Sequence, residues 1–166
     1  MTDIKTLFIV RHGKSSWDFE TVADIDRTLK EKGIRDAYDI AARISSKGLI
    51  PQLIVSSSAI RALHTAIIFS RVLGVPEKNI LISSGLLHTT PAKIIDFIGS
   101  TAASTDSMMI FGHNPGFTSL ANILSNLEIA NIPTAGLVKL EFETDSWKKI
   151  SRKNLVNESF EFPSNS

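Results

Sequence analysis

The chain has 166 residues, of which 43% are hydrophobic and 21% charged, and its formal net charge is +1. These proportions are those of an ordinary globular domain, and a chain of this length buries about 70% of its unfolded surface, so its core needs no disulfide or metal support. The charge balance gives no basic face for nucleic acid, the lack of cysteine excludes disulfides and thiolate catalysis, and no apolar run reaches the roughly 20 residues of a membrane span.

The first predicted element is a buried strand over residues 5–10, because a continuous apolar run fills it. Residues 14–28 show no clear periodicity and predict a long loop over the end of that strand. Residues 29–47 then predict a helix with one apolar face, which Gly48 ends as a C-terminal cap.

Buried strands and amphipathic helices alternate through the middle of the chain. The predicted strands cover residues 53–55, 80–82 and 108–111, and the predicted helices cover residues 59–73, 91–98 and 117–124. Thr90 and Pro91 are typical of a helix N-cap and first helical residue. Alternating strands and helices predict an α/β fold, a three-layer α/β/α sandwich with a mostly parallel central sheet.

The last third of the chain has a different pattern. Val138, Leu140 and Phe142 alternate with charged residues, which predicts a half-exposed strand. A turn at residues 144–146 predicts that residues 147–150 pair back as an antiparallel hairpin. The segment after residue 153 is mostly polar. We therefore expect a single domain over residues 1–153 and a C-terminal tail over residues 154–166.

Polar residues follow three of the four predicted parallel strands. They are Arg11 and His12 after the first strand, Ser57 and Arg61 after the second, and His113 and Asn114 after the fourth. Right-handed crossovers bring these strand ends to one edge of the sheet, where open α/β sheets bind ligands. Two arginines and two histidines at this edge predict a pocket for a dianion, and phosphate fits best because guanidinium groups bind its oxygens in pairs.

The position of His12 suits a nucleophile. An unprotonated histidine nitrogen in line with phosphorus can attack it, and neighbouring cations favour that form because they lower the histidine pKa. We expect the other ring nitrogen to bond to a backbone carbonyl, which would fix the tautomer. The start of the helix near Ala59 would add backbone N–H donors for the phosphate.

Three motifs resemble the signature of the histidine phosphatase superfamily, which includes the phosphoglycerate mutases. They are Arg11-His12-Gly13, residues 57–66 and residues 112–116, in the order of the family. The short chain and the segments 14–18 and 24–27 look most like its phosphohistidine phosphatase (SixA-type) branch.

The resemblance implies a metal-independent phosphatase without cofactors, in which His12 is phosphorylated. Water then hydrolyses the phosphohistidine and releases phosphate. Arg11, Arg61 and His113 would hold the phosphoryl oxygens. Further candidates for phosphate or substrate binding are Ser57, Gly13, Asp18, Asn114 and His88. Ser57 can equally be read as a turn or helix-cap residue.

The segment 83–90 departs from the mutase pattern, because mutases carry a general-acid glutamate in this region and the segment here contains no acid. An alkoxide leaving group needs a proton more than an imidazole does, which favours a phosphohistidine substrate. His88 or Asp18 could still donate a proton. We expect phosphohistidine on a protein as the substrate, and a cytoplasmic protein that binds neither nucleic acid nor membranes. The alternatives are a small-molecule phosphomonoesterase and a catalytically weak module that binds phosphorylated groups.

Overall fold

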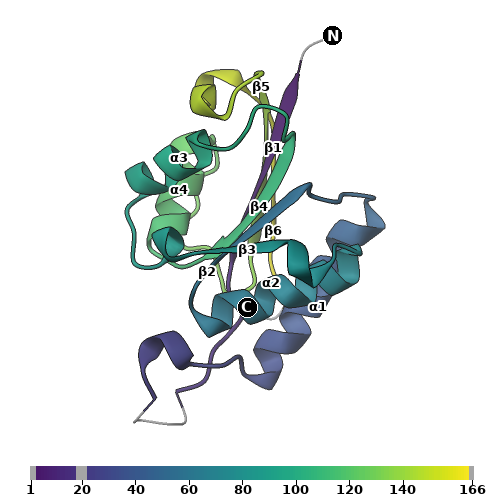
Figure 1. The fold of residues 1–166 in the computed structure, drawn as a ribbon, viewed down its shortest axis with the longest axis vertical. Coiled ribbons are helices and arrows are strands. Elements are labelled where there is room, and N and C mark those ends of the chain that lie inside the picture. The colour runs from purple at the N-terminus through teal and green to yellow at the C-terminus, as the bar shows by residue number, and fades with distance from the viewer. Residues whose placement is uncertain (1–2, 18–21, 165–166) are drawn as a thin grey trace.

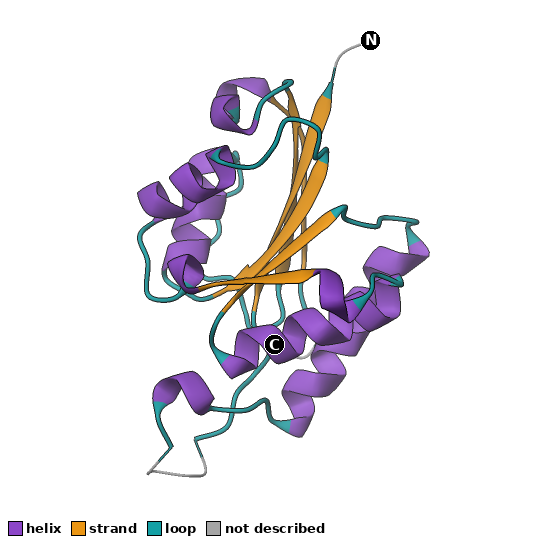
Figure 2. Cartoon of the chain, in the orientation of Figure 1, coloured by secondary structure: helices purple, strands orange, loops and turns teal. Residues whose placement is uncertain are grey.

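A six-stranded sheet forms the centre of the molecule in the computed structural model, which describes residues 3–17 and 22–164 (Figures 1 and 2). The strand order is β3-β2-β4-β1-β5-β6. The strands are β1 (Ile4–Arg11), β2 (Leu53–Ser57), β3 (Ile80–Ser83), β4 (Ser107–Gly112), β5 (Leu137–Glu143) and β6 (Leu155–Glu161). Strands β1 to β4 pair in parallel, whereas β5 runs antiparallel to β1 and β6 runs antiparallel to β5.

Two pairs of helices cover the two faces of this sheet. The helices are α1 (Glu31–Ser46), α2 (Ile60–Leu73), α3 (Pro91–Gly99) and α4 (Gly116–Leu124). Helices α1 and α2 lie on one face, and α3 and α4 lie on the other, as Figure 1 shows. The predicted three-layer sandwich with a mostly parallel sheet is therefore confirmed.

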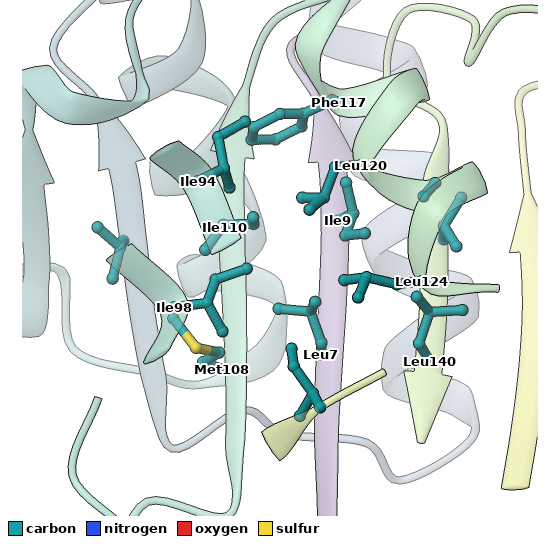
Figure 3. Packing of buried hydrophobic residues seen from close by; sticks show 14 of the residues in the cluster. Leu7, Ile9, Ile94, Ile98, Met108, Ile110, Phe117, Leu120, Leu124 and Leu140 are labelled. Carbon is teal, nitrogen blue, oxygen red and sulfur yellow. The ribbon is translucent and has the colours of Figure 1, made fainter. Parts of the chain in front are cut away.

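The central strand β1 is buried on both faces, which explains its unbroken apolar run. Leu7 and Ile9 point into the core beneath α3 and α4, where Figure 3 shows them among the side chains of those helices. Phe8 and Val10 point into the second core, beneath α1 and α2. Because both cores hold β1, the residues that follow it are fixed in position.

Two predicted helix boundaries are confirmed at the level of hydrogen bonds. The side chain of Thr90 accepts a bond from the backbone N–H of Lys93, and Pro91 follows it at the first helical position. Helix α2 ends at Gly74, which has a φ of 76°. A residue with a Cβ is disfavoured in that left-handed conformation.

The predicted hairpin partner was wrong. Residues Trp147–Lys149 form a 3₁₀ turn, in which the buried indole of Trp147 donates to the carbonyl of Thr105. The strand that pairs with β5 is β6, which lies within the segment that we expected to be a polar tail. Strand β6 is an edge strand in which no residue is fully buried, so its polar composition hid its role in the sheet.

Residues 14–17 and 22–28 of the loop after β1 take part in more regular structure than the sequence pattern indicated. Ser15 and Leu29 form an isolated antiparallel bridge, and Asp24–Asp26 form a single 3₁₀ turn between them. This loop lies at the carboxyl end of β1 (Figure 1). Within the described residues, no helix is both long and apolar enough to span a membrane.

Candidate active site

One cleft of about 380 Å³ gathers the residues that follow β1, β2 and β4. Arg11 at the end of β1 is in register with Gly112 at the end of β4, so the two strand exits lie side by side. The lining residues are Arg11, His12, Lys14, Ser15, Trp17, Arg27, Lys30, Arg61, His88, His113, Asn114 and Thr134. The four principal candidates, Arg11, His12, Arg61 and His113, are therefore brought together in this cleft. A larger cavity of about 500 Å³, lined by Asn122, residues 125–130 and Arg152, contains none of them.

The ring of His12 is fixed by its own neighbour. Its Nδ1 lies 2.6 Å from the carbonyl oxygen of Gly13. A carbonyl only accepts hydrogen bonds, so Nδ1 carries the proton and Nε2 keeps its lone pair. The side chain is 7% exposed. This is the tautomer that a nucleophilic Nε2 requires.

The pKa of His12 is lowered to about 4. Burial is the largest cause, and the charges of Arg61, Arg11 and Arg27 act in the same direction, whereas the bond to Gly13 opposes them. The ring is therefore neutral at physiological pH, and the cations that surround it are the groups that would hold an anion.

Gly13 is required by close packing. A Cβ on Gly13 would lie 2.8 Å from the carbonyl oxygen of Gly33 in α1, which is closer than real Cβ contacts. Its N–H donates to the hydroxyl of Thr65, which in turn donates to the carbonyl of Arg61. The backbone polar groups of Gly13 are thus engaged with the protein, and they fix His12 against α1 and α2.

The hydrogen bonds of Arg11 and Arg61 leave the Nε atom of each side chain without a partner among the described residues. Arg11 donates from one terminal nitrogen to the carbonyl of Ile132, and Arg61 donates from its two terminal nitrogens to Asp24. The buried Nε atoms of both arginines have no hydrogen-bond partner within the described part of the chain. Burial lowers the pKa of both guanidinium groups, but arginine remains charged at neutral pH.

Asp24 links two arginines of the cleft. Its carboxylate lies 3.1 Å from a terminal nitrogen of Arg61 and 3.0 Å from Nε of Arg27. Burial acts to raise the pKa of Asp24, but the bonds and charges of Arg27 and Arg61 outweigh it, so the pKa is lowered. Arg27 also donates to Ser15 and lies 3.5 Å from the ring centre of Trp17.

His113 and Ser57 form a hydrogen-bonded pair. Nε2 of His113 lies 2.7 Å from the hydroxyl oxygen of Ser57, which also accepts a bond from the N–H of Ala59. The hydroxyl proton can be donated to Nε2, and in that arrangement the ring proton of His113 lies on Nδ1. Nδ1 is buried and has no partner among the described residues, so in this tautomer it can donate to a ligand.

The pKa of His113 is lowered to about 3, first by burial and then by the charges of His12 and Arg61. The resemblance implied that His113 holds phosphoryl oxygens. The free protein holds the ring neutral, so any bond from His113 to such an oxygen comes from its single ring N–H. The ring centres of His12 and His113 are 5.2 Å apart.

The remaining candidates differ in their surroundings. His88 is largely exposed at the rim, stacks on His113 at 6.3 Å between ring centres, and lies 3.6 Å from Asp24. Asn114 lines the cleft, but its amide donates to Asn131 and the carbonyl of Ile132 and accepts from Thr118. Its side chain thus anchors the loop after β4. Asp18 lies outside the described residues.

Sequence reasoning missed the contribution of Arg27 and Lys30. Arg27 lies in a loop without periodicity, and only the Asp24–Arg27 spacing of three residues could have indicated a local ion pair. Lys30 is the N-cap of α1, where serine, threonine, aspartate or asparagine is expected. Among the described residues, no group of three or more histidine, aspartate or glutamate side chains is arranged to hold a metal ion.

Residues 7–85 match the family model of the histidine phosphatase superfamily (branch 1). An uncharacterized chloroplast protein of Arabidopsis thaliana is 32% identical over 153 residues, which cover 87% of this chain and 70% of that protein. Several 2,3-bisphosphoglycerate-dependent phosphoglycerate mutases also match, over only 27% to 36% of their own length.

Solved structures share the fold over almost the whole chain. A protein of Agrobacterium tumefaciens, provisionally named phosphohistidine phosphatase SixA, superposes with a TM-score of 0.80 at 23% identity and covers 96% of this chain and 99% of its own. The protein histidine phosphatase SixA in complex with tungstate superposes with a TM-score of 0.76 at 18% identity, over 95% and 94% of the two chains. At these identities the likeness establishes the fold.

Proposed function

The chain belongs to the histidine phosphatase superfamily, and on that premise we propose that it is a hydrolase that dephosphorylates phosphohistidine on a protein, with His12 as its nucleophile. The observation that carries the proposal is the geometry of His12. Its Nδ1–H is bound to the carbonyl of Gly13, and its Nε2 is unprotonated beside two arginines.

The proposed reaction has two steps. Nε2 of His12 attacks phosphorus, the Nε2–P bond forms, and the bond from phosphorus to the leaving nitrogen of the substrate breaks. A water molecule then attacks phosphorus, the Nε2–P bond breaks, and inorganic phosphate and one proton leave. The bound Nδ1–H holds the ring of His12 in one orientation through both steps. The chain's own residues supply positioning and charge, which account for most of the catalysis in phosphoryl transfer.

Three groups would hold the phosphoryl oxygens. Arg11 and Arg61 present their unpartnered Nε atoms, and His113 presents its unpartnered Nδ1–H. Each is buried, so a charge-assisted bond to a phosphoryl oxygen would satisfy a donor that otherwise has no partner. In this proposal Ser57 acts on the substrate through His113: its hydroxyl, 2.7 Å from Nε2, donates to that nitrogen and keeps the ring proton on Nδ1.

The choice of phosphohistidine rests on the described lining residues of the cleft, which include no carboxylic acid. Asp24 is the carboxylate that contacts the arginines of the cleft, and its lowered pKa keeps it ionised at neutral pH. An ionised carboxylate cannot protonate an alkoxide leaving group. The imidazole of a phosphohistidine needs less help to leave. His88 at the rim is the nearby group that could deliver a proton to it. The absence of cysteine from the sequence supports a reducing compartment such as the cytoplasm for this reaction.

The test is to trap the phosphoenzyme. The protein is mixed with a phosphohistidine peptide labelled on phosphorus, quenched within milliseconds, and digested to locate the label. We expect an acid-labile, alkali-stable phosphate on His12, together with a burst of unphosphorylated peptide. His12→Asn should remove both, because asparagine can keep the bond to Gly13 but has no nucleophilic nitrogen.

The substrate is tested by comparing kcat/KM for a phosphohistidine peptide and for an alkyl phosphate monoester. We expect the peptide to be preferred by more than about 100-fold. A preference for the monoester would favour the small-molecule phosphomonoesterase. Binding of phosphorylated ligands without turnover of either substrate would favour the binding module.

A further inference from the structure

The cleft carries more positive charge than one phosphoryl group can balance. Five cationic side chains line it: Arg11, Lys14, Arg27, Lys30 and Arg61. Asp24 contacts two of these arginines and offsets one charge. A phosphoryl dianion would offset two more, so two positive charges remain among the described residues of the cleft. Because the whole chain has a net charge of only +1, this excess is a local feature of the cleft.

The two remaining charges belong to Lys14 and Lys30, which lie side by side. The bridge between Ser15 and Leu29 is antiparallel, and the N–H of Lys30 donates to the carbonyl of Lys14 at 2.8 Å. Residues that face each other across such a bridge have side chains about 5 Å apart on one face. Both lysines are exposed at the mouth of the cleft, and neither forms an ion pair with a described residue.

Neither lysine is explained by stability. Like charges directly opposite each other in an antiparallel pair are destabilising. Lys30 is also the N-cap of α1, and its side chain makes no capping bond. A cation at that end is opposed by the helix dipole, and a side-chain oxygen would satisfy an N–H that lysine cannot. The positions of Lys14 and Lys30 are both unfavourable for stability, and both lysines lie at the mouth of the same cleft. This combination indicates that they bind a ligand.

We infer that Lys14 and Lys30 form a second anion subsite, which binds a further anionic group on the phosphorylated substrate. The shared chemistry is a carboxylate or phosphate placed next to the phosphoryl group, as on an acidic protein segment or a small molecule with two anionic groups. This inference rests on the proposed function for the position of the phosphoryl group, which lies deeper in the cleft between Arg11 and Arg61.

The first test measures binding alone, so it does not depend on turnover. The affinities of phenylphosphonate and 4-carboxyphenylphosphonate are compared by calorimetry for the wild type and for the double variant Lys14→Gln, Lys30→Gln. Each exposed ion pair contributes up to about fivefold, and the carboxylate would pair with two lysines. We therefore expect it to improve wild-type affinity by about tenfold and the ratio to approach one in the double variant. Lys153→Gln, at an exposed lysine outside the cleft, should keep the wild-type ratio.

The second test identifies the source of the anionic group. Rates are compared on phosphohistidine peptides with acidic or amide residues beside the phosphohistidine. A wild-type preference for acidic flanks that is lost in the double variant supports a protein segment as the source. If the carboxylate improves binding of the phosphonates but acidic flanks do not raise the rate on peptides, the source of the anionic group is a small molecule.

Equal affinities for the two phosphonates in the wild type, or a carboxylate preference that survives in the double variant, would overturn the inference. Failure of the proposed function is a different result. In that case no phosphohistidine peptide is turned over and no phosphoenzyme forms, while the phosphonate ratio still depends on the two lysines.

Discussion

The hydroxyl of Ser57 lies 2.7 Å from Nε2 of His113, and it also accepts a bond from the N–H of Ala59. We infer that the serine donates to His113, an arrangement that places the ring proton on Nδ1. A residue at the end of β2 would then orient a histidine that follows β4. The sequence offered two readings of Ser57, phosphate ligand and turn former. This hydrogen bond adds a third reading, in which the serine orients the ring of His113.

Ser57→Ala should lower kcat for phosphohistidine by about three- to tenfold, which corresponds to one hydrogen bond. KM should change less, because the arginines are untouched. Nitrogen NMR of His113 should show that the proton no longer resides mainly on Nδ1. The matched control is Ser56→Ala, since Ser56 is also buried but donates to a backbone carbonyl. A fall in kcat without a tautomer change would show that Ser57 acts in another way.

Protein stability should fall in acid because of His12. Its pKa is about 4 in the folded protein and about 6.5 otherwise, so between these values the unfolded chain binds a proton that the folded protein does not. The contribution of the neutral ring to the free energy of unfolding is complete above pH 6.5. It is lost as the pH falls towards 4, at about 1.4 kcal/mol per pH unit.

Urea denaturation of the wild type and His12→Asn at pH 7 and pH 5 checks this expectation. Between pH 7 and pH 5, the free energy of unfolding of the wild type should fall by about 2 kcal/mol more than that of the variant. The part of the acid effect of His113 that burial and Arg61 cause is present in both proteins and cancels in the difference. Equal losses in the two proteins would mean that His12 is not held neutral.

Asp24→Asn tests whether the carboxylate at the cleft is a proton donor. Because Asp24 has a lowered pKa and accepts bonds from Arg27 and Arg61, we expect it to orient the arginines only. The variant should change kcat on phosphohistidine by less than about tenfold, and the alkaline limb of its pH–rate profile should keep the wild-type position. A loss of more than 100-fold on a phosphate monoester alone, with that limb shifted, would identify Asp24 as a general acid.

The positions of strands and helices were largely predictable, because β1 is buried on both faces and its neighbours repeat the same pattern. The convergence of Arg11, His12, Arg61 and His113 followed from the parallel order of strands. The second hairpin strand was not predictable, since an exposed edge strand such as β6 lacks a strong apolar pattern. The roles of Arg27 and Lys30 were also hidden, because they depend on a bridge between Ser15 and Leu29 that has no sequence signal.

Lys30→Asn should stabilise the protein while it weakens binding of the second anionic group. Asparagine can cap the first turn of α1, and the substitution removes a like charge opposite Lys14. We expect the free energy of unfolding to rise by about 1 kcal/mol. The preference for 4-carboxyphenylphosphonate over phenylphosphonate should fall at the same time. A lysine that only stabilised the protein would not show these opposite effects on stability and binding. If Lys30→Asn lowers the free energy of unfolding and leaves the preference for 4-carboxyphenylphosphonate unchanged, Lys30 does not serve the ligand.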